Sequence, residues 1–171
     1  MTDALQDFAT SFPSFLQWLG VMIAAAVPFV DAYFGAVIGV LIGLPAPIAI
    51  GAAVIGNVIS MLVFVFTAHG VRAKVVAGRA AASAAGVSPD GAPASVPSSP
   101  RREKVRRAFD KYGVAGVSLI GPIILPSQFT SAAMVSFGAN RNAVIAWQIV
   151  SIVLWGTVFG VLASLGVALA R

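Results

Sequence analysis

The amino-acid sequence contains no cysteine and little charge among its 171 residues. Without cysteine, the chain has neither a disulfide framework nor a thiolate metal site. Charged residues make up 10% of it and hydrophobic residues 58%, whereas about a quarter of an ordinary soluble domain is charged. A soluble domain of this size cannot bury so much apolar surface. The composition therefore excludes a cytosolic enzyme, a nucleic-acid-binding domain and a disordered chain. It predicts a multi-pass protein of the inner (cell) membrane.

Other familiar signals are also missing. Residues 1–12 carry Asp3 and Asp7 but no lysine or arginine, so they lack the basic region of a secretory signal. The sequence has no phosphate-binding glycine loop, which argues against an ATP-driven pump. His69 is the only histidine, and a single histidine does not make a metal site. We therefore expect neither a metal nor another cofactor.

The positive charge gathers in the middle of the chain. Nine of the eleven basic residues lie between Arg72 and Lys111. Because basic loops of membrane proteins face the cytoplasm, we expect residues 69–112 to be cytoplasmic, and no nucleic acid is needed to explain them. Within this loop, Ala, Ser, Pro and Gly fill nineteen of the 23 positions of 78–100, a composition typical of a flexible linker.

Residues 101–112 have a different pattern. Val105, Ala108, Phe109 and Tyr112 recur at helical spacing, and basic residues surround them. This pattern predicts a basic amphipathic helix suited to the anionic cytoplasmic surface of the lipid bilayer.

The first half of the chain, residues 1–77, contains two apolar stretches. Residues 13–30 are apolar up to Asp31, and residues 32–68 then contain no charge. This second stretch is too long for one span of about 20 residues. Its prolines near 45 divide it into a span at 48–68 and a short piece at 32–44. We expect the short piece to form a re-entrant hairpin, 13–44, with the preceding block.

The second half, residues 101–171, repeats this order of elements. A broken apolar block at 113–139 predicts a second hairpin, and 142–169 predicts a second span. Pro28 and Pro122 each precede their span by 20 residues. The fold class that we expect is all-α integral membrane, built from two inverted halves that each contain a re-entrant hairpin and a transmembrane helix. Both termini then lie outside the cell.

Asp31 is the only carboxylate within the apolar regions, so it is the first candidate for chemistry. Two interpretations remain open. Asp31 caps the helix that begins at Ala32, at the membrane surface, or it is a buried acid that takes up and releases a proton.

The other candidates are the breaks and one amide. Pro28 precedes Asp31, and Pro122 and Pro126 interrupt the second hairpin just before Ser127 and Gln128. Prolines this close cannot both lie inside a regular helix, so the segment is either a kinked helix or, as we expect, a re-entrant loop. Its polar side chains then satisfy freed backbone groups or face a substrate.

Asn57 lies in the middle of a span, where an amide either bonds to another helix or lines a cavity. Glycines at 35, 39 and 43 form a stripe that favours close helix packing and offers a face for a homo-oligomer.

Together these motifs resemble the small multidrug export protein family, which is distantly similar to the DedA membrane proteins. The resemblance covers nearly all of the chain except 78–100. Its residues are Pro28, Asp31, the glycine stripe, Pro47, Gly56-Asn57, Lys111-Tyr112-Gly113 and the second proline break. The resemblance implies opposed re-entrant hairpins with a carboxylate at the first tip, here Asp31 where the family more often has Glu. The Arg that DedA-type proteins tend to carry in the second hairpin is absent, which weakens the case for a lipid-phosphate substrate.

Our first hypothesis is a secondary transporter that couples protons to the movement of a small amphipathic or lipid-like substrate. The alternative is a membrane scaffold or assembly protein that transports nothing. We expect no enzyme, because a membrane enzyme needs paired titratable groups and the apolar regions hold one.

Overall fold

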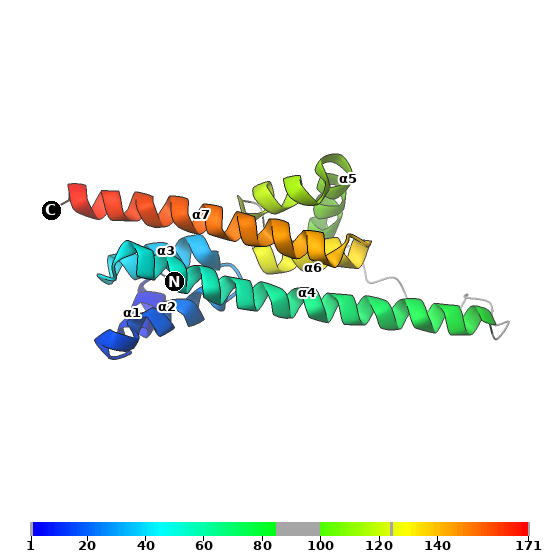
Figure 1. Ribbon diagram of the computed structural model, residues 1–171, viewed down its shortest axis with the longest axis horizontal. Helices are drawn as coiled ribbons and strands as arrows, with labels where there is room; N and C mark the ends of the chain where they lie inside the picture. Colours follow the sequence, from blue (N-terminus) through cyan, green and yellow to red (C-terminus); the bar gives the residue numbers. More distant parts are fainter. Residues whose placement is uncertain (1, 85–99, 124, 171) are drawn as a thin grey trace.

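The computed structural model describes residues 2–84, 100–123 and 125–170, which form helices and no strand (Figure 1). In chain order these are α1 (Thr2–Thr10), the 3-10 helix η1 (Ser14–Leu16), α2 (Gln17–Ala26), α3 (Asp31–Leu41), α4 (Ala46–Ala84), α5 (Pro100–Ile120), the 3-10 helix η3 (Gly121–Ile123), α6 (Ser127–Phe137) and α7 (Arg141–Leu169). The predicted all-α class is confirmed for this part of the chain.

Two of these helices are long and apolar enough to cross a membrane, namely residues 46–78 of α4 and all of α7. A third span is counted if α1 and the segment Ser14–Ala26, which are bent by 114° at their junction, are taken as one broken helix. The helices α4 and α7 lie side by side and run in opposite directions (Figure 1). Gly156 of α7 faces Val54 of α4, and Gly160 faces Ile50, so the two helices are antiparallel.

The helix α4 is longer than the sequence predicted. We expected a span that ends at 68 and a flexible linker from 78, but α4 continues to Ala84. No proline occurs between Pro47 and Pro89, and alanine and arginine favour the helix. The charged residues after His69 therefore make the helix surface polar without ending the helix. The rest of the predicted linker, residues 85–99, lies outside the described residues.

The short helices pack across the two halves of the chain. The helix α3 packs against α2, α4 and α7, whereas α6 packs against α4, α5 and α7. The second helix of each predicted hairpin therefore contacts the long helix of the other half.

The glycine stripe serves packing within this chain. Gly35 is so close to Ala25 and Ala53 that it has no room for a side chain, and Gly39 is equally close to Ala49. Gly43 instead has a φ of +95° just past the end of α3, where glycine adopts a conformation that other residues avoid. The stripe is thus occupied by α2 and α4 and does not offer the free face for a second copy that we expected.

The helix α5 consists of two segments joined at Gly113, whose φ of 67° and ψ of −170° are not helical. The first segment, Pro100–Tyr112, corresponds to the predicted basic helix. Its apolar side rests on the protein, because Val105 is buried and the ring of Phe109 lies 6.4 Å from that of Phe137. The second segment packs against α7, where the indole nitrogen of Trp155 donates a hydrogen bond to the carbonyl of Leu119 at 2.9 Å.

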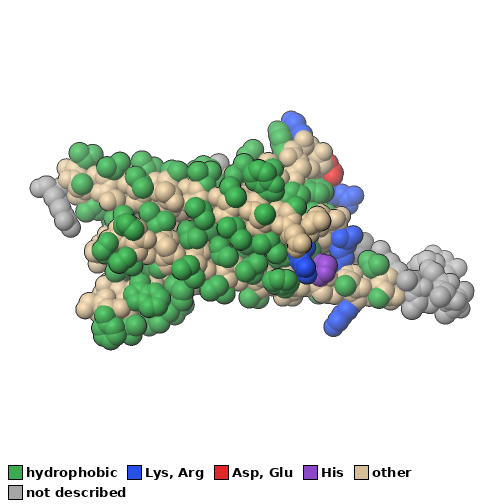
Figure 2. Space-filling model, in the orientation of Figure 1, with side chains coloured by type: hydrophobic (Ala, Val, Ile, Leu, Met, Phe, Trp, Pro, Cys, Tyr) green, Lys and Arg blue, Asp and Glu red, His purple; other side chains and the backbone are tan. Residues whose placement is uncertain are grey.

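The molecule is apolar outside and partly polar inside. Figure 2 shows hydrophobic side chains over much of the face in view, with lysine and arginine gathered at one end. Large aliphatic residues on α4 and α7 are half exposed, among them Ile55, Val63 and Leu162, while nine polar or charged side chains of the described residues are buried. This is the reverse of a soluble protein and fits helices that face lipid.

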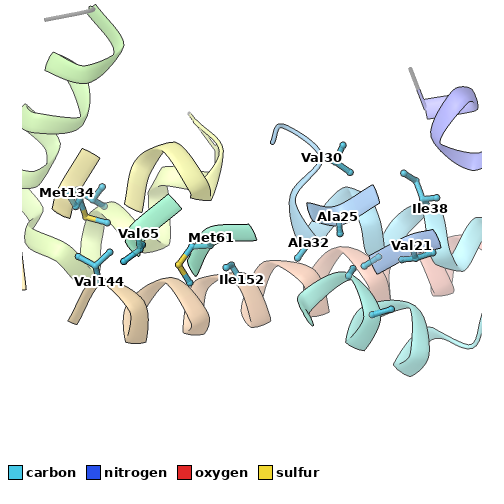
Figure 3. Packing of buried hydrophobic residues seen from close by; sticks show 14 of the residues in the cluster. Val21, Ala25, Val30, Ala32, Ile38, Met61, Val65, Met134, Val144 and Ile152 are labelled. Atoms are coloured by element: carbon cyan, nitrogen blue, oxygen red, sulfur yellow. The ribbon is translucent and has the colours of Figure 1, made fainter. Parts of the chain in front are cut away.

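The buried apolar side chains form one cluster, in which Figure 3 shows two groups of labelled residues. One group joins α2 and α3, with Val21, Ala25, Val30, Ala32 and Ile38. The other joins α4, α6 and α7 nearer the charged end, with Met61, Val65, Met134, Val144 and Ile152.

Candidate functional site: a buried carboxylate between two broken helices

Asp31 is the first residue of α3 and lies inside the protein, with only 1% of its surface exposed. Its φ is +51°, and that of Phe29 in the same break is +78°. Aspartate tolerates this left-handed region better than most residues. The N-cap of α3 is Val30, and it makes no side-chain cap bond. Asp31 is therefore buried within the protein and is not the cap of α3.

The Asp31 carboxylate accepts hydrogen bonds from both halves of the chain. One oxygen, Oδ1, accepts from Asn57 Nδ2 at 2.9 Å and from Ser127 Oγ at 2.5 Å. The other, Oδ2, accepts from the backbone N–H of Ser127 at 3.3 Å. Three donors thus converge on one carboxylate, which offsets the cost of burying it.

The remaining amide groups close the network. Gln128 Nε2 donates to Asn57 Oδ1 at 2.7 Å, and the same oxygen lies 3.2 Å from Ser127 Oγ. Asn57 and Ser127 are 1% exposed and Gln128 is fully buried. We call Asp31, Asn57, Ser127 and Gln128 the carboxylate cluster.

The two broken helices aim their amino ends at this cluster. Asp31 begins α3 and Ser127 begins α6, and each helix has 11 residues. Unpaired N–H groups give a helix amino end a partial positive charge. Both ends therefore favour a negative charge at Asp31, and Ser127 supplies one of its free N–H groups directly.

A small cavity adjoins the carboxylate. Its volume is about 10 Å³, which is near the minimum for one water molecule. It is lined by Asp31, Ala32, Tyr33, Asn57, Pro122, Ser127, Ser151, Ile152 and Trp155. The cavity thus connects the carboxylate cluster to α7.

The predicted site residues fall into two groups. Asp31, Asn57, Ser127 and Gln128 form the cluster itself. The three prolines instead shape the breaks around it.

Pro122 lines the small cavity, and Pro28 lies in the turn between α2 and α3. Pro126 is the N-cap residue of α6, and its carbonyl accepts hydrogen bonds from Thr130 N and Thr130 Oγ1, both at 3.1 Å. These prolines hold the backbone, and none contributes a polar side chain.

Sequence reasoning missed two residues at this site, Gln148 and Ser151 of α7. Both are fully buried, and Ser151 lines the small cavity. Their spacing of three residues within an apolar span was a usable signal, because it places both on one helix face.

A larger cavity of about 280 Å³ lies between the two segments of α5, η3 and α6. Apolar side chains including Val105, Val117 and Leu125 line it, together with Lys104 and Arg107 of the basic segment. It reaches Gly121 and Thr130, which flank the second break. The break therefore separates a large apolar cavity from the small cavity at the carboxylate.

Within the described residues, no three His, Cys, Asp or Glu side chains gather as metal ligands would. Comparison with known proteins gives no match to a protein-family model, to a curated protein or to a solved structure.

Proposed function

We propose that this chain is a membrane transporter-like protein that carries protons on Asp31 and moves a small amphipathic or lipid-like substrate. The observation that carries the proposal is the carboxylate cluster, in which an acid is buried between two broken helices and held by donors from both halves. Broken helices that meet around a binding site are a recurrent device of secondary transporters. The same arrangement is what the resemblance to the small multidrug export family implies.

The length of α4 supports a site at the middle of the membrane. The guanidinium of Arg141 lies 5.3 Å from the ring of Phe66 and marks the charged end of the apolar body. Ala46 begins α4 at the other end. The helix between them is about 30 Å long, which equals the thickness of the hydrocarbon core. Asn57 lies about midway, so we infer that the cluster is at mid-membrane depth and that both hairpins are re-entrant.

The packing supports two inverted halves. The long helices α4 and α7 run in opposite directions, and each receives the short helix of the other half. Figure 2 shows lysine and arginine at one end of the molecule, where Arg72 lies beside Gly138 and Arg141 lies beside Phe66, so the positive-inside rule makes this end cytoplasmic. The end of α7 lies at the opposite end of the molecule (Figure 1). This orientation puts both chain termini outside the cell membrane.

The cluster can hold Asp31 with or without a proton. Without one, the carboxylate accepts from Ser127 Oγ. A serine hydroxyl both donates and accepts, so Ser127 can turn its hydrogen toward Asn57 Oδ1, 3.2 Å away, and accept from a protonated Asp31. The Asn57 carbonyl has a second lone pair for this bond. One rotation of a hydroxyl thus lets the same partners serve both states.

The large cavity supports an amphipathic substrate. Its walls are apolar, and Lys104 and Arg107 lie at its edge. Because it ends at the second break, a molecule that enters it presses on the segment between Gly121 and Thr130. That segment contains Ser127, which donates a hydrogen bond to Asp31. Substrate in the cavity and a proton on Asp31 can therefore affect each other through this segment.

Single cysteines test the opposed hairpins, since the chain has none of its own. We would place them at Phe29 and Leu125 in the two breaks, with a control at Ala139 beside the charged end. In whole cells and inverted vesicles, an impermeant thiol reagent should label Ala139→Cys from the cytoplasmic side. The break positions should be protected or should react from opposite sides. Free labelling of both breaks from one side contradicts the proposed topology.

Proton coupling is tested in vesicles loaded with a pH-sensitive dye. Ethidium and a short-chain fluorescent phosphatidylserine serve as amphipathic probes of opposite charge. We expect one of them to cause proton movement with the native protein and not with Asp31→Asn. The scaffold alternative is favoured if the native protein moves neither probe and cells with the Asp31→Asn variant behave like cells with the native protein.

A further inference from the structure

Three fully buried side chains of the described residues have polar atoms without a hydrogen-bond partner. They are Ser118 in α5 and Gln148 and Ser151 in α7. Both the amide nitrogen and the amide oxygen of Gln148 lack a partner. Buried polar groups almost always have partners, either in the protein or in ordered water. Within the described residues, the protein's own hydrogen bonding is therefore incomplete at these three side chains and at Nε of the partly buried Arg141.

Leaving such groups unpaired is costly. An unpaired buried amide or hydroxyl loses its hydrogen bonds to water and gains none in the protein. In Gln148 this applies to both polar atoms of the side chain. A methionine or leucine would fill this position without that cost. The glutamine thus needs a partner that is mobile or is itself small, and water is the smallest that can both donate and accept.

Ser151 of α7 adjoins the carboxylate cluster, and Gln148 lies three residues before it on the same side of the helix. Ser151 lines the small cavity with Asp31 and Ser127. Gln148 lies three residues, a rise of about 4.5 Å, nearer the charged end and on the same face. Asp31, Ser151 and Gln148 thus follow one another in the direction of Arg141.

The opposite direction is closed by tight packing. Gly156 touches Ala32, and Gly160 is pressed against Ile50 and Ala36. Of the described residues, none of the unpartnered buried polar atoms comes from α2, from α3 or from α7 beyond Ser151. Apart from Ser118 of α5, the unpartnered buried polar atoms of the described residues therefore lie from Asp31 toward the charged end.

We propose that Ser151 and Gln148 bind water molecules that carry the proton between Asp31 and the charged end of the protein. This inference rests on the proposed role of Asp31 as a proton carrier and adds the route. The serine hydroxyl and the amide of Gln148 each offer a donor and an acceptor, so they can orient a chain of waters. Each water in the chain accepts one proton and releases one. The last transfer forms an O–H bond on the Asp31 carboxylate, and release is the reverse.

An apolar group lies beside this route at the charged end. Met61, Val65, Met134 and Val144 are fully buried there (Figure 3). Water that reaches Gln148 from the charged end has to pass them, so the route fills when these side chains separate. Among the described residues that line the small cavity, Tyr33 is the only titratable group besides Asp31, and its response must be separated from that of Asp31.

Infrared spectroscopy after a rapid pH jump tests the route on the full-length protein in vesicles. The band of a protonated carboxylic acid belongs to Asp31 if it disappears in Asp31→Asn, and a tyrosine does not absorb there. We would compare Gln148→Met and Ser151→Ala with Ser118→Ala, which removes an equally buried hydroxyl that does not line the small cavity. Ser151→Thr keeps the hydroxyl and serves as the conservative variant.

We expect Gln148→Met and Ser151→Ala to slow the appearance of the Asp31 band by roughly tenfold or more, with the same final amplitude. Ser118→Ala and Ser151→Thr should keep the native rate. Native rates in both test variants overturn the route but leave Asp31 as the proton carrier. A chain in which no Asp31-dependent band responds to pH overturns the proton carrier and the route together. If Gln148→Met unfolds the protein, the glutamine has a protein partner and the proposal is again wrong.

Discussion

Replacing Asp31 should destabilise the protein by an amount that depends on how many of its donors lose their acceptor. In Asp31→Leu, the hydroxyl of Ser127 can turn to Asn57 Oδ1, but Asn57 Nδ2 and the backbone N–H of Ser127 have no acceptor left. An unsatisfied buried donor costs about 1–3 kcal/mol, so the total is roughly 2–6 kcal/mol. In Asp31→Asn, the side-chain oxygen keeps the two bonds to Oδ1, and only the N–H of Ser127 faces a new donor. That variant should lose about 1–3 kcal/mol.

Thermal unfolding in detergent, followed by tryptophan fluorescence, measures this order. For a chain of this length, each kcal/mol corresponds to about 2–4 °C in Tm. We expect Asp31→Leu to unfold roughly 5–20 °C below the native protein, with Asp31→Asn between the two. Asp110 is exposed on α5, so Asp110→Leu should change stability by less than about 0.5 kcal/mol. The reasoning is refuted if Asp31→Leu is as stable as the native protein, because the three donors then do not depend on the carboxylate.

Three further variants test the packing that surrounds the site. Gly56→Ala puts a methyl group against a backbone carbonyl of α2 and should destabilise the protein by about 1–3 kcal/mol. Gly51→Ala on the same helix meets open space and should stabilise it by about 0.5–1 kcal/mol. Chemical unfolding should therefore show changes of opposite sign in the free energy of unfolding of the two variants. Asn140 accepts hydrogen bonds from two backbone N–H groups at the start of α7, so Asn140→Ala should lower stability by about 0.5–2 kcal/mol, and an unchanged midpoint contradicts this cap. Trp155→Phe leaves the carbonyl of Leu119 without its donor and should cost about 1 kcal/mol; an unchanged unfolding midpoint contradicts the contribution of this hydrogen bond.

The carboxylate cluster was within reach of sequence reasoning because polarity inside an apolar run is conspicuous. Asp31, Asn57, Ser127 and Gln128 interrupt long hydrophobic stretches, and each interruption demands a partner. The sequence could not say that these four partner one another. Their pairing depends on how α3 and α6 cross α4, which hydrophobic composition does not encode.

Two elements were harder to predict for different physical reasons. The end of α4 was placed too early, because hydropathy shows where the apolar part of the helix ends. Helix propensity and the absence of proline decide where the helix itself ends. The spacing of Gln148 and Ser151 placed both on one face of an apolar span, but the sequence does not show which residues surround that face. Their lack of partners is a property of the packed structure and not of the residues themselves.

The carboxylate cluster also constrains how the protein is made. Asp31 and Ser127 are 96 residues apart, so the ribosome, at about 5–20 residues per second, needs roughly 5–20 s to deliver the partner after the acid. During that interval the first half has an incomplete site, with Asn57 as the only side chain available to Asp31. If the proposed topology holds, insertion of the first hairpin should be completed only when the second hairpin enters the membrane. Expressing the two halves as separate chains would make this dependence visible as instability of the first half alone.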